Sequence, residues 1–441
     1  MAKFETRRVV ITGYGCYCSA GEDANSTYAA MQAGEQFIRY ERPWLEAQTP
    51  EIYHPKLRSS LAARAADPNL LSDPAFAAQV DERYIERYLS RSAQLWWKAS
   101  AEALRHARVV TQMLELSAVE PERFAFSIGT GIGGGTEIGD YRSEMEEGNA
   151  LSATDMNRAQ PENAEVTSAK LYTARGPGVT VTKACASSNF AISEAVRRIQ
   201  GGEADVISAG GTEALDATVI AAFERTKAGS FDSDPALASR PFHREPGKAV
   251  LSEGAAVLIL EDERFARTRG ATIYGEVAGF GETNDAHDPT LLDGKGIVRA
   301  MKLALHRAKI SPEDKLLLAA HATATPQGDI AERDAILEVF NSGHYSFDQI
   351  KRRVLSIKGF TGHPVGAATG VAAVMFTMAL NEGRFFPASW LNDQDFLDKT
   401  EELSPSTDKV DEVEADAVLS NGMGFFGQNS SIVIKKYQED A

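Results

Sequence analysis

Residues 179–189 read Val-Thr-Val-Thr-Lys-Ala-Cys-Ala-Ser-Ser-Asn. This segment has the pattern of a strand, a turn and the start of a helix, and the same strand–helix alternation recurs along the chain. It begins with a β-branched run, continues through a tight turn of small residues around Cys185, and leads into a helical pattern that extends to Ile199. A short apolar strand followed by an amphipathic helix is the repeating unit of α/β proteins.

The same alternation continues along all 441 residues. Amphipathic segments separate the short β-branched runs, and one of these segments places Trp96, Ala99 and Ala103 on one helical stripe. The chain is therefore expected to have α/β architecture. Residues 67–79 fit neither pattern and are expected to form an irregular surface excursion. Besides 179–182, the strand-like runs are 9–12, 124–128, 206–209, 256–260, 273–277, 316–319, 354–357, 417–420 and 431–435.

The second half of the chain repeats the order of the first. Residues 8–15 lead from a strand into Gly-Tyr-Gly, and residues 272–281 lead from a strand into Gly-Phe-Gly. The offsets between such equivalent segments vary, so the pattern indicates a diverged duplication, with coincidence between common strand–turn patterns as the alternative. The duplication predicts an N-terminal half of residues 1–265 and a C-terminal half of residues 266–441.

Composition and charge argue against several classes of protein. The 46 Lys and Arg residues against 62 Asp and Glu residues give a net charge of −16, which disfavours nucleic acid or an anionic membrane as the main partner. The start of the sequence has no apolar run long enough for a signal peptide. The longest apolar stretch, 370–380, is about half of what a membrane span needs. These features predict a cytoplasmic protein.

The three cysteines differ in their surroundings. Cys16 and Cys18 have no Cys or His cluster nearby to complete a metal site, so we expect small buried thiols, with a metal or redox role as the alternative. Cys185 lies at the start of a helix, where the helix dipole and free backbone N–H groups are expected to lower the pKa of its thiol. A nucleophile that accepts an acyl group needs the thiolate. A buried structural thiol is the alternative interpretation.

Two histidines occupy strand exits in the second half of the chain. His321 directly follows an apolar strand, and His363 lies between a strand and a helix. A lone histidine at a strand end is more often a hydrogen-bonded structural residue. With only eight histidines in the chain, two at equivalent strand exits opposite Cys185 make a catalytic role as good an interpretation as a structural one.

Two glycine-rich stretches follow or precede predicted strands. Residues 129–135 contain the spacing Gly-x-Gly-x-x-Gly, but residues 136–160 are polar and lack the second strand and acidic residue of a dinucleotide site. We expect close backbone packing near a pocket there. Residues 421–427, Asn-Gly-Met-Gly-Phe-Phe-Gly, offer backbone amides for an oxyanion hole or a gate, with an ordinary turn as the alternative.

Together these motifs resemble the 3-oxoacyl-(acyl-carrier-protein) synthases of the type I/II branch, within the thiolase-fold condensing enzymes. The resemblance covers nearly the whole chain, and the order and spacing of its motifs make it specific. It implies a thiolase-like, five-layered αβαβα fold from two duplicated halves, usually in a dimer. The matching motifs are Ala-Cys185-Ala-Ser, His321-x-Thr-x-Thr-Pro-x-Gly-Asp329, Lys358-x-x-x-Gly-His363 and Asn421-x-x-Gly-Phe425.

The resemblance also implies a role for each matching residue. Cys185 would accept an acyl chain from an acyl carrier protein, and His321 and His363 would stabilise the enolate formed as malonyl thioester loses CO₂. The enolate would then attack the Cys185 thioester. The resemblance implies no cofactor of the chain's own, and substrates that are carried on the phosphopantetheine of an acyl carrier protein. The resemblance further implies that Lys358 tunes the environment of the histidines, with Asp329 and Glu332 as a supporting acidic pair. The backbone N–H groups of Cys185 and Phe425 would form an oxyanion hole, and Phe425 would also be a gate. Thr323 and Thr325 would line the pantetheine tunnel, and Ile132 would lie at the neck of the acyl pocket.

The chain departs from the family pattern at several positions. Ala372 stands where the family commonly has a glutamate associated with a structural ion, so no metal is expected. Phe426 replaces a hinge glycine of the gate and Gln428 replaces a common threonine, which predicts a gate that is stiffer or differently shaped. Residues 160–165 are polar where relatives are more apolar, and residues 246–250 replace another common segment. These departures suggest polyketide or polyene assembly rather than bulk fatty-acid elongation.

Other members of the superfamily fit less well. A degradative thiolase needs a second cysteine near the C-terminus, and no cysteine follows Cys185. The initiating synthases use Cys, His and Asn, whereas His363 favours the Cys-His-His branch. A non-catalytic chain-length subunit remains an alternative, although such subunits typically lack the cysteine.

The resemblance also predicts the partners of the chain. We expect a homodimer or a heterodimer with a related subunit. A local basic patch, with Arg225 and Lys227 as candidates, would bind the acidic carrier protein.

Overall fold

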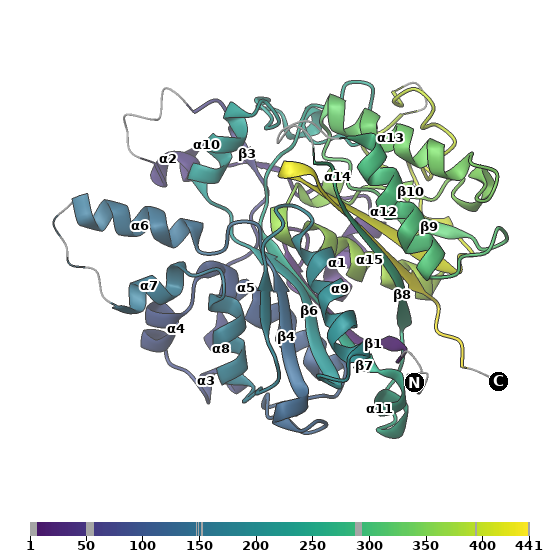
Figure 1. Cartoon of the computed structure of the whole chain (residues 1–441). Helices are drawn as coiled ribbons and strands as arrows, with labels where there is room; N and C mark the ends of the chain where they lie inside the picture. Colours follow the sequence, from purple (N-terminus) through teal and green to yellow (C-terminus); the bar gives the residue numbers. More distant parts are fainter. Residues whose placement is uncertain are drawn as a thin grey trace.

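The predicted strands all lie in one mixed sheet (Figure 1). The computed structural model describes residues 7–49, 57–146, 148, 150, 153–286, 293–392 and 395–439. Each predicted run corresponds to one strand of the 10-stranded sheet, which confirms the α/β prediction. In spatial order the strands are β10 (Val354–Leu355), β9 (Leu316–Ala319), β13 (Ala417–Gly424), β14 (Gln428–Lys435), β8 (Gly275–Asn284), β1 (Val9–Cys18), β7 (Gly254–Asp262), β6 (Val206–Glu213), β4 (Phe124–Gly129) and β5 (Val179–Val181).

The sheet consists of two halves with the same topology. The order β1-β7-β6-β4-β5 in the first half matches β8-β14-β13-β9-β10 in the second. In both halves the first two pairings are antiparallel and the last two are parallel. β1 and β8 join the halves through the pairs Val10–Glu276 and Ile11–Gly275. The repeated order supports a duplication, and we propose that the halves divide near residue 265.

Helices cover the outer faces of the two half-sheets and fill the space between them. α5 (Arg91–His106) packs on β1 and β7, and α12 (Gly294–Arg307) packs on β8 and β14. α9 (Ser187–Gln200) and α15 (Ala368–Glu382) contact each other and strands of both halves. This arrangement gives the five αβαβα layers (Figure 1). The other helices are α1 (Ala24–Gln32), α2 (Arg42–Ala47), α3 (Pro74–Ala77), α4 (Glu82–Tyr88), α6 (Gly135–Glu146), α7 (Ala153–Ala159), α8 (Asn163–Leu171), α10 (Ala217–Arg225), α11 (Glu263–Thr268), α13 (Pro326–Phe340) and α14 (Lys358–Thr361).

The helix α15 forms the centre of the core. It is apolar on all sides because it lies between the two half-sheets, and its residues from Ala368 to Leu380 are buried. Residues 365–382 are the one helical stretch in the described part of the chain that is long and apolar enough to cross a membrane. Because 89% of this stretch is buried inside the protein, we assign it as a core helix.

The Phe376 side chain should make one of the larger single contributions to the stability of this core. Its exposure is 0%, and its ring centroid lies 5.4 Å from that of Phe385 and 6.1 Å from that of Phe386. We expect Phe376→Ala to lower the free energy of unfolding by about 3–5 kcal/mol, because it leaves a cavity among packed rings. Urea unfolding followed by circular dichroism measures this loss. The matched control Met113→Ala, at a side chain 44% exposed, should change stability by less than about 0.5 kcal/mol, and equal losses would contradict the assignment.

The expected surface excursion at residues 67–79 is instead partly a core segment. Leu70 and Phe76 are buried, and the Phe76 ring stacks on Trp97 of α5 with centroids 5.7 Å apart. The Asp73 side chain caps α3 by accepting from the Ala75 N–H at 2.9 Å, and Arg105 binds the same carboxylate. The prediction was wrong because two buried apolar residues spaced between polar ones show neither a strand nor a helix period.

Candidate active site

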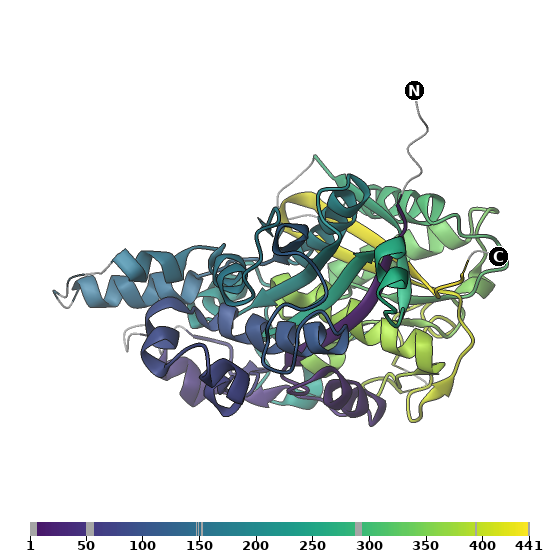
Figure 2. The ribbon, with the colours of Figure 1, turned by 90° about the horizontal axis from the view of Figure 1, so that it is seen from below.

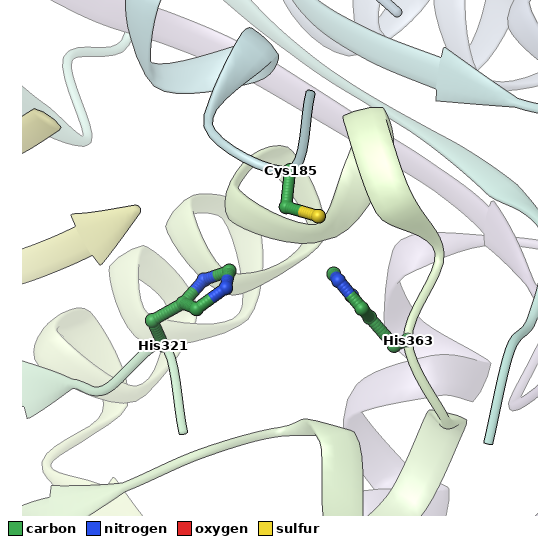
Figure 3. Close-up of side chains that lie close together, drawn as sticks. All are labelled: Cys185, His321 and His363. Carbon is green, nitrogen blue, oxygen red and sulfur yellow. The ribbon is translucent and has the colours of Figure 1, made fainter. Parts of the chain in front are cut away.

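Cys185, His321 and His363 come from three separate segments and meet at one point (Figure 3). Cys185 lies in the turn between β5 and α9, His321 follows β9, and His363 follows α14. The cysteine Sγ and one ring nitrogen from each histidine all lie within 4.8 Å of one another. The two imidazoles are nearly perpendicular, at 87°, with centroids 5.6 Å apart. Both rings therefore face the space beside the sulfur.

The small residues around Cys185 allow the backbone to approach closely. Ala184 has a left-handed backbone, with φ 48°, and the Ser187 hydroxyl accepts from the Lys183 N–H at 2.8 Å across the turn. A Cβ atom on Gly424 would lie 2.7 Å from the Lys183 carbonyl oxygen. The glycine-rich end of β13 thus packs directly on the nucleophile turn, which accounts for glycine at position 424.

The helix α9 also fixes Cys185 relative to the histidines in the other half of the chain. The Ser188 hydroxyl donates to the Gly366 carbonyl at 2.5 Å, three residues after His363. The Asn189 N–H donates to the Thr369 hydroxyl at 3.0 Å. These buried side chains explain the small polar residues that follow Cys185 in the sequence, because they hydrogen-bond across the interface between the halves.

The protonation state of Cys185 differs from the expectation. Cys185 is 5% exposed, and burial raises the pKa of its thiol to about 12, with the positive charge of Lys358 opposing this rise only in part. The prediction of a lowered pKa is therefore wrong for the unloaded protein. The sequence shows the helix start at which the thiol lies but not how completely the surrounding strands remove water from it. Any reaction in which this sulfur acts as a nucleophile must include removal of the thiol proton.

This pKa predicts how alkylation of Cys185 depends on pH. We expect the rate of modification by iodoacetamide to keep rising about tenfold per pH unit between about pH 7 and 9, because the thiolate fraction increases in that proportion below the pKa. Mass spectrometry of the Cys185 peptide over time measures this rate. A rate that levels off below about pH 8 would show a lowered pKa and support the helix-dipole prediction.

Both histidines are held in the neutral state. Burial lowers the pKa of His321 and of His363 well below the ordinary value, and the positive charge of Lys358 lowers both further. Within the described residues, His321 Nδ1 and both ring nitrogens of His363 are buried without a hydrogen-bond partner. Buried polar atoms usually have partners, so these nitrogens are suited to bind polar atoms of a substrate.

Lys358 and Glu332 support His321 through its backbone. The Lys358 ammonium donates to the His321 carbonyl, and the Glu332 carboxylate accepts from the N–H groups of His321 at 2.9 Å and Ala322 at 2.6 Å. The Asn421 amide donates to Glu332 at 3.1 Å. Burial lowers the pKa of Lys358 to about 8, while nearby carboxylates oppose that change. The network thus fixes the segment that carries His321 and places a buried cation beside both imidazoles.

Asp329 lies on the first turn of α13, beside this network. Its carboxylate accepts from the Phe242 N–H at 2.9 Å, and burial raises its pKa to about 7. Asp329 and Glu332 are both fully buried, and each interacts electrostatically with Lys358. The structure therefore brings together the two acids and the lysine that the sequence predicted as a supporting set.

A cavity of about 1040 Å³ contains the reactive side chains in its lining. Thr323 and Thr325 also line it, with their hydroxyl oxygens 3.0 Å apart, as do Phe425 and Phe426, so the gate stays a prediction. Ile132 is outside this lining and is 39% exposed, so its place at an acyl-pocket neck stays a prediction. The remaining residues of the lining include both predicted basic residues, Arg225 and Lys227.

The polar segment 160–165 does not reach this cavity either. Asn163 is buried at the start of α8, where its amide donates to the carbonyls of Tyr88 and Asn157 and accepts from the Ser90 N–H. Its polarity thus serves packing between helices. This segment gives no support to an unusual substrate.

Glu213 is a buried carboxylate that the sequence analysis missed. It ends β6, is 2% exposed, and accepts from the N–H groups of Gly131 at 2.6 Å, Ile132 at 3.2 Å and Gly366 at 2.8 Å. Burial raises its pKa to about 7. Glu213 connects the glycine-rich loop 129–135 to the segment after His363. An acidic residue directly after a small-residue strand was the signal that could have identified it.

Comparison with protein families gives matches to both halves. Residues 6–266 match the family described as beta-ketoacyl synthase, N-terminal domain, and residues 274–391 match its C-terminal domain. The mitochondrial 3-oxoacyl-[acyl-carrier-protein] synthase of Arabidopsis thaliana is 32% identical over 97% of this chain and 93% of its own length. The 3-oxoacyl-[acyl-carrier-protein] synthase 2 of Synechocystis sp. is 31% identical over 99% of this chain and 100% of its own.

Solved structures show the same fold over nearly the whole chain. A beta-ketoacyl synthase from Burkholderia phymatum STM815 superposes with a TM-score of 0.83 at 27% identity, covering 98% of this chain and 100% of that one. The ishigamide ketosynthase/chain length factor superposes with a TM-score of 0.82 at 25% identity, with the same coverage. These matches confirm the predicted thiolase-like architecture.

Proposed function

This chain belongs to the beta-ketoacyl synthase family, and we propose that it catalyses a decarboxylative Claisen condensation between a Cys185-bound acyl group and malonyl carrier protein. The product is a 3-oxoacyl carrier protein. The observation that carries this proposal is the approach of Cys185 Sγ and the His321 and His363 nitrogens to within 4.8 Å of one another, in the lining of one cavity.

The first step transfers the acyl group to Cys185. The sulfur attacks the carrier thioester, the thiol proton moves to a neighbouring neutral imidazole, and the carrier thiol leaves with a proton. The negative charge that develops on the acyl oxygen would be met by the backbone N–H groups of Cys185 and Phe425. Neutral histidines are required here, because a protonated imidazole cannot accept the proton.

The second step forms the new carbon–carbon bond. The C–CO₂⁻ bond of the malonyl thioester breaks, CO₂ leaves, and its electron pair forms an enolate whose oxygen accepts N–H bonds from His321 and His363. The enolate carbon attacks the Cys185 thioester carbonyl, and the C–S bond breaks. The sulfur regains a proton, and the product stays on the carrier. The positive charge of Lys358, beside both imidazoles, keeps them neutral during this step.

Exposed apolar side chains gather on a projection from the body of the molecule. α6 and α7 extend away from the sheet (Figures 1 and 2), and Ile138 and Met145 on α6 are 59% and 63% exposed. Met156 on α7 and Val166 on α8 are 54% and 58% exposed. We propose that this surface contacts a second subunit in a homodimer or in a heterodimer with a related synthase subunit.

The biosynthetic pathway in which the chain works is a separate part of the proposal. The relative from Synechocystis sp. is named a 3-oxoacyl-[acyl-carrier-protein] synthase 2, and one similar solved structure is the ishigamide ketosynthase/chain length factor. We favour polyketide or polyene assembly in the cytoplasm, because Phe426 changes the gate. A non-catalytic chain-length subunit is the second candidate, and the altered gate also favours it. The complete set of Cys185, His321 and His363 favours the enzyme.

Mass spectrometry tests the proposal directly. The protein is incubated with acyl-loaded and malonyl-loaded carrier protein, with a series of acyl chain lengths. An acyl adduct on Cys185 and a product two carbons longer are the expected results. Absence of both, with the cognate carrier and any partner subunit present, would favour the chain-length subunit.

A further inference from the structure

Phe426 has an unusual conformation for an aromatic residue. Its backbone is left-handed, with φ 65° and ψ 25°, and its side chain is 69% exposed. No other large hydrophobic side chain in the described ranges is as exposed. Left-handed backbone is unfavourable for residues with a Cβ atom, and such strain persists where the surroundings hold it in place.

The loop around Phe426 is fixed by hydrogen bonds from β8 and β14. The side-chain amides of Asn284 and Gln428 donate to the Phe426 carbonyl, each at 3.4 Å. The Gly427 carbonyl accepts from the Asp285 N–H at 3.0 Å. Because the backbone is held on both sides, the Phe426 ring stays displayed at the surface.

The two neighbouring aromatic residues point to different surroundings. The Phe425 ring packs against Phe223 of α10, with centroids 5.5 Å apart, and is only partly exposed. The Phe426 ring lines the same cavity but is mostly in solvent. A residue that acted only on the acyl chain inside the cavity would not need this exposure, whereas a residue that meets a macromolecule would.

Three cations lie in the lining of the same cavity. They are Arg225, Lys227 and Lys248, and among the residues that the structure describes Asp293 is the only carboxylate in that lining. Within the described part of the chain, none of the three forms a salt bridge with a carboxylate. The Lys248 ammonium instead lies over the Phe231 ring, 4.8 Å from its centroid. In a chain with a net charge of −16, three cations without a carboxylate partner in the lining of one cavity are a local reversal of charge.

We propose that Phe426 is the apolar anchor on which the acyl carrier protein docks, and that Arg225, Lys227 and Lys248 meet acidic side chains of the carrier around it. This inference rests on the proposed function. Aromatic residues within a polar rim commonly dominate the affinity of an interface. Complementary charge increases the rate of encounter and sets the orientation. A carrier held here would have its pantetheine arm at the opening that leads to Cys185.

The test compares one acyl group on two carriers. KM is measured for the acyl carrier protein and for the same acyl group on N-acetylcysteamine, a small thioester without a protein. For Phe426→Asn, which tolerates left-handed backbone, KM for the carrier substrate should rise at least about tenfold. Any rise in KM for the small thioester should be at least about fivefold smaller than the rise in KM for the carrier substrate. Phe426→Tyr should restore a KM near that of the wild type, because it keeps the ring.

Matched controls and opposing outcomes make the test decisive. Met113→Asn removes an apolar side chain that is 44% exposed and lies outside the cavity lining, and it should leave both KM values unchanged. Equal rises in both KM values for Phe426→Asn would overturn docking in favour of a gate for the acyl chain. An unchanged KM of Phe426→Asn for the carrier substrate would also overturn docking. If that variant instead lost binding to anionic lipid vesicles while its KM for the carrier stayed unchanged, Phe426 would contact a lipid surface and not the carrier protein.

The failure of this inference can be distinguished from failure of the proposed function. If only docking is wrong, the wild-type protein forms the Cys185 adduct and Phe426→Asn keeps the wild-type KM for the carrier. If the proposed function is wrong, the wild-type protein forms no adduct from either thioester, and the docking proposal falls with it.

Discussion

Replacement of Cys185 by alanine is expected to remove the acyl adduct and to lower the rate of condensation by at least about a thousandfold, because neither of the other two cysteines, Cys16 and Cys18, is in the described lining of the cavity to hold the acyl chain as a thioester. The same variant should still release CO₂ from malonyl carrier protein. His321 and His363, the proposed enolate site, remain in place, and alanine at position 185 leaves the cavity open to the malonyl group. Mass spectrometry of the protein and trapping of labelled CO₂ measure the two activities separately.

Cys16 offers a matched control for this variant. It is a free thiol in β1 with 0% exposure, outside the lining of the cavity. Cys16→Ala should form the Cys185 adduct and condense at a rate close to that of the wild type. An acyl adduct that persists in Cys185→Ala would contradict the assignment of the nucleophile. Loss of CO₂ release along with condensation would show that Cys185 also supports the decarboxylation site.

The architecture could be predicted well because its signal is local. Each strand of the sheet is a short apolar run between polar or glycine-rich segments, and the duplication is visible in the order of these runs. The positions of Cys185, His321 and His363 at strand exits followed from the same pattern. That the three side chains meet could not be derived from spacing. Only the resemblance to a family implied that they meet. In the folded chain the two half-sheets pair through β1 and β8, and the three side chains from the two halves lie together.

Properties that depend on burial were predicted poorly. The pKa of Cys185 rises because segments far apart in the sequence exclude water from the sulfur. The role of Glu213 depends on three N–H groups from two distant loops. Residues 67–79 join the core because Phe76 meets Trp97. In each case the deciding contact lies between residues that are remote in sequence, so no local period reveals it.

Left-handed backbone occurs at several residues near the cavity, as well as elsewhere in the described chain, for example at Arg108. Ala184 precedes the nucleophile with φ 48°, Ala324 lies between the two lining threonines with φ 59°, and Val365 follows His363 by two residues with φ 28°. A β-branched residue such as valine is especially unfavourable in this region. Such positions persist where packing imposes them, and they commonly mark functional sites. Phe426 is another left-handed residue beside the cavity.

Removal of either imidazole is expected to lower CO₂ release and to keep the Cys185 adduct, which is the reverse of the result expected for Cys185→Ala. His321→Ala and His363→Ala should each lower CO₂ release from malonyl carrier protein by about 10²–10³-fold, equivalent to about 2.7–4 kcal/mol, because each removes one N–H donor from the enolate oxygen. Each single variant should still form the Cys185 adduct, since the other imidazole remains to accept the thiol proton. Labelled CO₂ release and mass spectrometry of the adduct distinguish the two effects.

His344 provides the control for these variants. It is exposed, it lies outside the cavity lining, and its ring contacts Tyr345. His344→Ala should leave CO₂ release and adduct formation unchanged. A single variant at His321 or His363 that decarboxylates at the wild-type rate would remove that residue from the enolate site. If both single variants lost the adduct as completely as Cys185→Ala, the imidazoles would act mainly on the thiol, and the enolate would need other donors, of which the Lys358 ammonium is the nearest buried cation.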